Sequence, residues 1–289
     1  MSETTAMPVE TLDLTMADHA ALLRAVEALE KVTIASRLTN LLGRQMAAVS
    51  HLLPERIRSA ANLGANLALR SAMGAALRSL REGRRPASSR LHKAALAASG
   101  AAGGALGFVA LPFEIPASTV LLLRAIADVA RAEGEDMADP QTALACLEVF
   151  ALGGRTEADD HLNSSYFAIR TLLARSMSEA SRYVIQKGLV DEAAPVMVKL
   201  AAKIAARFGV ALSQKMAAQA IPVIGAMGGA AVNLAFLQHF EQIAEGHFTV
   251  RRLERLYGAA PVRAEYERLR TDALPRGPAQ TAAGADPTG

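Results

Sequence analysis

Residues 93–113 read KAALAASGAAGGALGFVALPF, and residues 216–238 read MAAQAIPVIGAMGGAAVNLAFLQ. Neither stretch carries a charge between its ends, and both place small residues four apart, on one helix face. Glycine inside a helix costs about 1 kcal/mol relative to alanine, and the usual compensating gain is close approach of two helix backbones. The two stretches therefore predict a pair of apolar helices packed at their glycines. The predicted crossing residues are Gly100, Gly103, Gly104, Gly107, Gly225, Gly228 and Gly229.

The rest of the chain also favours helices. Apolar residues recur at helical spacing, runs of alternating apolar and polar residues are absent, and β-branched residues are few. We expect helices over about residues 17–49, 54–80, 118–133, 140–152, 157–187 and 195–209, in addition to the two glycine-rich ones. The sequence thus predicts an all-α fold, a multi-helix bundle with two central glycine-rich apolar helices packed together.

Composition divides the chain into three parts. Residues 1–16 predict a flexible N-terminal arm, and residues 17–258 predict one helical domain. Residues 259–289 predict a short helix and a disordered tail, because the segment after Arg270 is rich in Pro, Gly and Ala.

Charge is distributed unevenly, although the net charge is only +3. Residues 37–93 hold eleven Lys or Arg against two acids, and residues 128–160 hold nine acids against two Arg. The single cysteine, Cys146, fits a reducing compartment. The first twenty residues have neither the basic region nor the apolar core of a secretory signal. We therefore expect a cytoplasmic protein, peripheral on the inner face of the membrane.

The glycine-rich stretches leave two interpretations open. They can form a buried hairpin of a soluble bundle, or they can insert in or lie against a bilayer, since each just reaches the length that a bilayer crossing needs. A basic cluster before the first stretch favours contact with anionic lipid headgroups, at about 1 kcal/mol for each charge near the surface. The alternative for that cluster is a solvated turn. Its members are Arg81, Arg84, Arg85, Arg90 and Lys93.

Four polar residues near these stretches form a candidate buried ion pair or ligand site. Glu114 lies between two prolines at the end of the first stretch, and Lys215 precedes the second. If the glycine helices pack together, Glu114 can pair with Lys215 or with Arg124, because an unpaired buried carboxylate is costly. Asn233 lies within the second stretch. A structural pair, a ligand or ion site and a catalytic carboxylate remain alternatives.

Recognisable catalytic and cofactor motifs are absent. The chain has no G-x-S-x-G elbow, no phosphate-binding loop, no H-E-x-x-H and no Cys-x-x-Cys. Asp159, Asp160 and His161, with His239 and His247, could supply metal ligands, but adjacent helical residues point about 100° apart and rarely share one ion. We expect no metal, no cofactor and no nucleic-acid partner, since the basic region lacks interleaved aromatics.

Two blocks of the sequence resemble the EcsC family. The first is ALPFEIPASTVLLLRAIADVARAEGED (Ala110–Asp136), with its glycine-rich lead, Pro-acid-x-Pro turn and leucine-rich helix. The second is QKMAAQAIPVIGAMGGAAVNLAFLQHFEQIAEGHFTVRRLERLYG (Gln214–Gly258), with the Ile221-Pro222 step and the closing Arg252–Gly258 segment. The chain departs from the family pattern at Glu114, where Asp is commoner, and this change keeps the charge. The biochemical role of the family is not established.

Three hypotheses for function follow. The first is a non-enzymatic helical protein that associates with an anionic membrane surface; the resemblance implies an accessory role beside an ABC transporter. The second is a hydrolase, either a peptidase or a lipid-acting enzyme, centred on Glu114 or on Asp160 and His161. The third is a soluble carrier whose glycine-lined core holds a lipid-like ligand.

Overall fold

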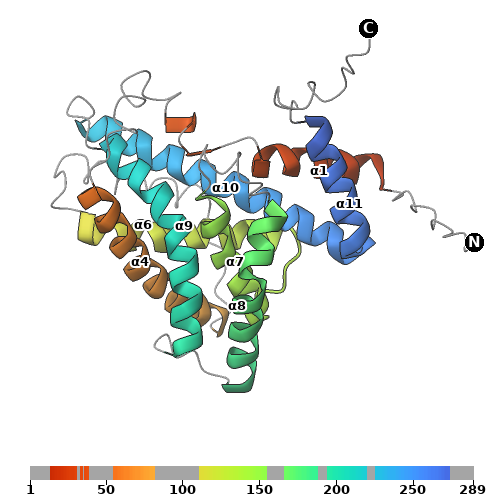
Figure 1. Cartoon of the computed structure of the whole chain (residues 1–289), viewed down its shortest axis with the longest axis horizontal. Coiled ribbons are helices and arrows are strands. Elements are labelled where there is room, and N and C mark those ends of the chain that lie inside the picture. The colour runs from red at the N-terminus through yellow and green to blue at the C-terminus, as the bar shows by residue number, and fades with distance from the viewer. Residues whose placement is uncertain are drawn as a thin grey trace, which may run out of the picture.

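Most of the chain consists of helix-forming residues, and Gly and Pro residues lie where helices begin or end. Figure 1 shows the resulting arrangement of helices. The computed structural model describes residues 14–30, 33–34, 36–38, 55–81, 111–154, 166–187, 194–219 and 225–273. Within these ranges the chain forms helices joined by turns and contains no strand, which confirms the all-α prediction. The helices are α1 (Met16–Glu30), α4 (Glu55–Arg81), α6 (Leu111–Ala132), α7 (Pro140–Leu152), α8 (Tyr166–Lys187), α9 (Pro195–Gln219), α10 (Gly225–Tyr257) and α11 (Ala259–Ala273).

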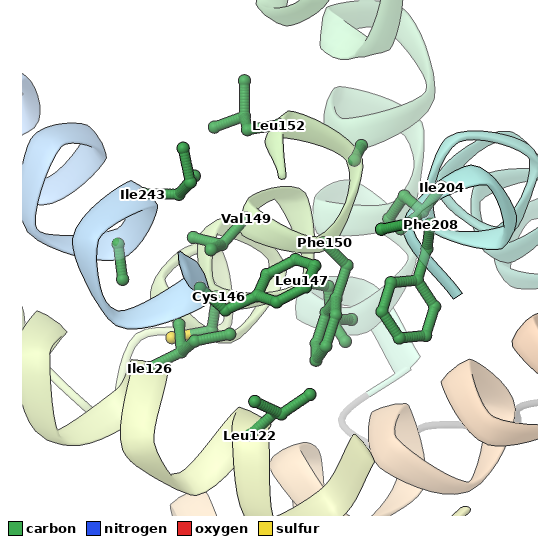
Figure 2. Close-up of a cluster of buried hydrophobic side chains, with 14 of the residues drawn as sticks. Leu122, Ile126, Cys146, Leu147, Val149, Phe150, Leu152, Ile204, Phe208 and Ile243 are labelled. Carbon is green, nitrogen blue, oxygen red and sulfur yellow. The ribbon is translucent and has the colours of Figure 1, made fainter. Parts of the chain in front are cut away.

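Helix α7 lies within the hydrophobic core, surrounded by other helices. Every residue from Thr142 to Leu152 is buried, as expected of a helix that is apolar on all sides. Asp139 caps its N-terminus by accepting a backbone N–H at 2.8 Å, and Pro140 follows where no backbone donor is needed. Figure 2 shows core side chains that meet here, among them Leu122, Ile126, Cys146, Leu147, Val149, Phe150, Leu152, Ile204, Phe208 and Ile243.

Two glycines end α7 and allow its neighbours to approach. A Cβ added to Gly153 would overlap the ring of Phe240 on α10. A Cβ added to Gly154 would overlap the backbone carbonyl of Arg207 on α9. Glycine at these two positions therefore sets how closely α9 and α10 can pack against the end of α7.

Helix α10 is the longest helix among the described residues and joins two groups of helices (Figure 1). One part of it packs against α6, α7 and α9, and it also packs against α1 and α11. A Cβ on Gly246 would lie 2.9 Å from Cγ of Leu29 on α1, so this glycine permits the contact. Gly258, with φ of +90°, turns the chain from α10 into α11.

Small residues pack α4 closely against α9. Four alanines form most of the buried side of α4, each 0 % exposed: Ala61, Ala65, Ala68 and Ala72. On α9, Gly209 lies so close to Asn62 of α4 that an added Cβ would overlap the amide oxygen. Residues 100–107 lie outside the described ranges, so the predicted crossing of the two glycine stretches is not part of this description. Among the described residues, small side chains allow a close helix contact between α4 and α9.

Three predicted helix boundaries are wrong. The helix expected over residues 195–209 runs on to Gln219 as α9, so the second glycine-rich stretch, residues 216–238, is divided between α9 and α10 instead of forming one helix. The helix expected over residues 17–49 does not run unbroken, because Thr33 is non-helical and its Oγ1 accepts the backbone N–H of Ser36 at 3.2 Å, a helix-capping contact. Helix α6 begins at Leu111 rather than at Ser118. Pro112 lies in the first turn, where backbone donors are unpaired anyway, and Pro116 lies inside the helix, which continues past it.

None of the helices that the structure describes combines the length and the apolarity needed to cross a membrane.

Candidate functional site

Glu114 and Lys215 form a buried ion pair between α6 and α9. Glu114 lies in the first turn of α6, and Lys215 lies near the end of α9. Nζ of Lys215 is 3.0 Å from Oε1 of Glu114, and the two residues are 1 % and 7 % exposed. Nε2 of Gln219, one turn further along α9, donates to the same oxygen at 3.3 Å. The structure thus brings together two of the four polar residues that the sequence singled out.

The surroundings of this pair are largely apolar. Burial lowers the pKa of Lys215, because the loss of hydration disfavours the charged amine more than Glu114 favours it. The ring of Phe236 on α10 lies beside the amine, with its centroid 5.2 Å from Nζ. Oε2 of Glu114 is buried and has no hydrogen-bond partner among the described residues. The pair therefore retains one acceptor for a further donor.

Asn233 and Arg124 occupy different positions. Asn233 is buried on α10 at 1 % exposed, one turn before Phe236 and on the same side of the helix. Arg124 is exposed on α6. It lies more than two turns beyond Glu114, about 15 Å along the axis. Arg124 is therefore not part of the buried pair.

Several other predicted residues lie outside the described ranges: Gly100, Gly103, Gly104, Gly107, Arg84, Arg85, Arg90 and Lys93. Arg81 ends α4 and Gly225 begins α10. Gly228 is half-buried and Gly229 is buried on α10. Residues 159–161, which carry the Asp-Asp-His segment, are outside as well. Within the described ranges, no group of three His, Cys, Asp or Glu side chains is placed to hold a metal ion.

The two histidines considered as metal ligands each have a protein partner instead. His239 is buried, and its Nε2 lies 2.8 Å from the carbonyl oxygen of Gly153. Burial lowers the pKa of His239 to about 4, so the ring is neutral at pH 7 and donates from Nε2. His247 is buried too, and its Nδ1 lies 2.9 Å from the hydroxyl of Tyr166.

A second cluster of charges joins the other end of α6 to α10. Glu135, just after α6, accepts two hydrogen bonds from Arg251 at 2.9 Å and a further one from Arg255. Burial raises the pKa of Glu135, but these two guanidinium groups more than reverse that effect and leave the pKa lowered. Next to it, Arg252 bridges Glu133 and Asp18 at 2.9 Å each. The acidic segment after α6 is thus held by arginines of α10.

A cavity of about 400 Å³ lies between α7, α8 and α10. Its walls combine apolar, hydroxyl and charged side chains, with exposed residues of α8 at its mouth. The lining residues that matter below are Leu144, Ala145 and Glu148 of α7, Arg170, Ala174 and Arg182 of α8, and Arg251 of α10. The sequence analysis did not single out this group.

Glu148 is the buried acid of the cavity, at 6 % exposed. Burial raises the pKa of Glu148 to about 7, and the nearby guanidinium groups of Arg170 and Arg251 only partly offset the loss of hydration. Its Oε2 lies 3.9 Å from Nε2 of His247. The carboxyl group can therefore exchange a proton near neutral pH inside a walled space.

A chain of hydrogen bonds runs behind Glu148. Arg170 forms a bidentate pair with Glu254, at 2.7 and 3.1 Å, and donates to the hydroxyl of Tyr166 at 3.3 Å. Burial holds the pKa of His247 well below its usual value, so the ring is neutral. Because the Tyr166 oxygen accepts from Arg170, its proton goes to Nδ1 of His247. This assignment places the single N–H proton of the neutral ring on Nε2, the nitrogen nearest to Glu148.

One signal in the sequence could have identified the cavity. Glu148 is the only charged residue of the helix PQTALACLEVFAL, and a lone acid on an otherwise apolar helix is unusual unless it is paired or functional. Its neighbours Arg170 and Arg251 come from α8 and α10, and spacing along the chain gives no sign that they meet. The nearby Cys146 is a buried thiol whose pKa burial raises to about 12, so it is protonated at pH 7.

The chain matches the EcsC protein family model over residues 17–253, most of its length. No curated protein and no solved structure matches the chain. The geometry gives a physical reason for the two blocks that carry the resemblance. Glu114 of the first block pairs with Lys215 of the second, and Glu135 of the first pairs with Arg251 of the second. The chain therefore belongs to the EcsC protein family.

Proposed function

We propose that this protein is a non-enzymatic helical protein that docks peripherally on an anionic membrane surface, where it serves as an accessory to a membrane transporter. The observation that carries the proposal is the exposure of Leu63 and Leu67 on the side of α4 opposite its buried alanines.

The outward face of α4 carries two leucines one turn apart. Leu63 is 63 % exposed and Leu67 is 56 % exposed, and the exposed Arg70 follows them on the same side. Full burial of a leucine side chain contributes about 1.5–3 kcal/mol. A soluble bundle would gain by turning these leucines inward, so their exposure supports a second surface that covers them.

Charge supports a lipid surface as that second surface. Helix α4 ends at Arg81, and residues 37–93 around it hold eleven basic residues against two acids. Each basic residue near an anionic bilayer contributes about 1 kcal/mol. Leucines that enter the headgroup region beside arginines that pair with phosphates are the usual arrangement of an interfacial helix. We therefore assign the outward face of α4 to anionic lipid.

Vesicle co-sedimentation tests this assignment. The full chain is mixed with phosphatidylcholine vesicles, with or without phosphatidylglycerol, at low and at high salt. We expect the chain to pellet only with the anionic vesicles and to be released partly by salt, because screening weakens the charge attraction. The Leu63→Ser/Leu67→Ser variant should bind at least tenfold more weakly.

A matched variant tests whether weaker binding comes from the outward face of α4 or from making any part of the surface more polar. Leu172 on α8 and Leu256 on α10 are 60 % and 63 % exposed, so Leu172→Ser/Leu256→Ser removes the same apolar area elsewhere. This variant should bind as the wild type does. Equal losses in both variants, or equal binding to neutral vesicles, would contradict docking through α4.

The accessory role extends the docking proposal and rests on the family, whose name comes from a gene beside an ABC exporter. We expect the Leu63→Ser/Leu67→Ser variant to lose any effect of the chain on the ATPase rate of a co-reconstituted exporter. An effect that survives in this variant would separate the accessory role from membrane docking.

A further inference from the structure

The cavity between α7, α8 and α10 has the size and walls of a small-molecule site. Its volume of about 400 Å³ lies within the range of about 300–1,000 Å³ usual for ligand pockets. Leu144, Ala145 and Ala174 supply apolar wall on two sides. Such a wall accepts a short hydrocarbon body, while the polar groups of the cavity fix its other end.

The charged side chains that line the cavity decide which polar group of a ligand fits there. Three guanidinium groups, those of Arg170, Arg182 and Arg251, line the cavity against one carboxyl group, Glu148. The acids that pair with two of these arginines are not among the lining residues. The pairing of Arg251 uses its Nε and Nη2, which leaves the protons of Nη1 for a ligand. The lining therefore favours an anionic head.

We propose that this cavity binds a small organic anion with an apolar body, and that Glu148 takes up a proton as the anion binds. A neutral Glu148 donates a hydrogen bond to the anion, whereas an ionised Glu148 repels it. The charged and titratable groups that act on Glu148 come from α8 (Arg170, Tyr166) and from α10 (Arg251, Glu254, His247). This site is separate from the outward face of α4 and does not depend on membrane docking.

The balance of protons follows from this assignment. Binding moves one proton from solvent to the Glu148 carboxylate, and no covalent bond forms or breaks in the ligand. Because burial holds the pKa of Glu148 at about 7, the carboxyl group is mostly neutral at pH 6 and mostly ionised at pH 8. Binding should therefore strengthen as pH falls through this range.

Isothermal titration calorimetry with octanoate on the full chain tests the proposal. We expect a Kd about tenfold lower at pH 6 than at pH 8, as one linked proton requires. Glu148→Gln keeps a donor but cannot ionise, so its Kd should be the same at both pH values and close to that of the wild type at pH 6. Acetate, which lacks the apolar body, should bind more weakly than octanoate.

A second variant tests the site even if Glu148→Gln does not fold. Ala174 is exposed on α8 and lines the cavity, so Ala174→Leu fills space without displacing the core. It should weaken octanoate binding at least tenfold. Ala202→Leu makes the same change at an exposed position of α9 outside the lining and should leave binding unchanged.

Three results would overturn the proposal. The first is octylammonium binding more tightly than octanoate, which would mark a cation site. The second is octanoate binding that Ala174→Leu does not weaken, which would place the ligand elsewhere. The third is an absence of binding by the folded wild type at pH 6.

Discussion

Lys215 and Glu114 are separated by 101 positions in the sequence, yet Nζ of one lies 3.0 Å from Oε1 of the other in the buried contact between α6 and α9. This contact joins the two blocks that define the family in this chain, and the contact of Glu135 with Arg251 joins them again at the far end of α6. Glu133 with Arg252 and Glu135 with Arg255 add to the second contact, so ion pairs connect the blocks at both ends of α6. Four predictions follow, on the Glu114–Lys215 pair, on the shifted pKa values of Glu148 and His239, and on the close contact at Gly154.

Removing one partner of the buried pair should be strongly destabilising. Lys215→Met leaves the Glu114 carboxylate buried without its cation, a change that typically costs about 3–5 kcal/mol. Replacing both, as in Glu114→Gln/Lys215→Met, removes both charges and should recover much of that loss. Urea unfolding gives the free energies. The exposed-site variant Arg124→Gln should stay within about 0.5 kcal/mol of wild type, and a Lys215→Met loss no larger than this would contradict the burial of the pair.

Glu148 should make the protein less stable as pH rises. The pKa of Glu148 is about 7 in the folded chain against 4.5 for an ordinary glutamate. Its contribution to the stability of the folded state is therefore fully present below pH 4.5 and is lost as pH rises through 7. The shift corresponds to about 3 kcal/mol. Glu148→Gln should therefore raise the free energy of unfolding at pH 8 and change it little at pH 5. The variant Glu179→Gln, at a half-buried position of α8, is the control, and equal gains at both pH values would refute the shift.

His239 should destabilise the protein in acid. Its pKa is about 4 when folded against 6.5 ordinarily, so its contribution is present above pH 6.5 and is lost as pH falls towards 4. Between pH 7 and pH 4.5, the free energy of unfolding of His239→Gln should therefore fall by about 2–3 kcal/mol less than that of the protein with His239. Because Glu148 acts in the opposite sense over this range, the comparison is best made in the Glu148→Gln background. His19→Gln, at a half-buried position, should retain the full acid loss.

Gly154 and Gly64 should respond differently to alanine. A Cβ on Gly154 meets the rigid backbone of Arg207, whereas a Cβ on Gly64 meets the side-chain end of Ile115 at 3.2 Å. Gly154→Ala should therefore lower the melting temperature by well over 5 °C, because α9 must move. Gly64→Ala should change stability by less than about 1 kcal/mol, since the better helix propensity of alanine offsets the crowding. Similar losses in both would show that α7 and α9 are not in close contact.

Local signals determined the helical class and several boundaries. Asp139 and Pro140 start α7 and Gly153 and Gly154 end it, so the prediction of a helix over residues 140–152 matches the structure. These residues act through their own backbone and nearest neighbours. The incorrect prediction at Thr33 also concerns a local signal, since this threonine caps a helix instead of continuing one.

The tertiary structure alone decided which side chains meet. Sequence allowed Glu114 to pair with Lys215 or Arg124, and only the packing of α9 on α6 buried Lys215 while leaving Arg124 exposed. Packing alone also grouped Glu148 with arginines of α8 and α10. It likewise buried four alanines of α4 while leaving Leu63 and Leu67 of the same helix exposed. Propensity and capping energies depend on neighbours in sequence, whereas ion pairs, cavities and exposure depend on the distances between helices, which no single helix specifies.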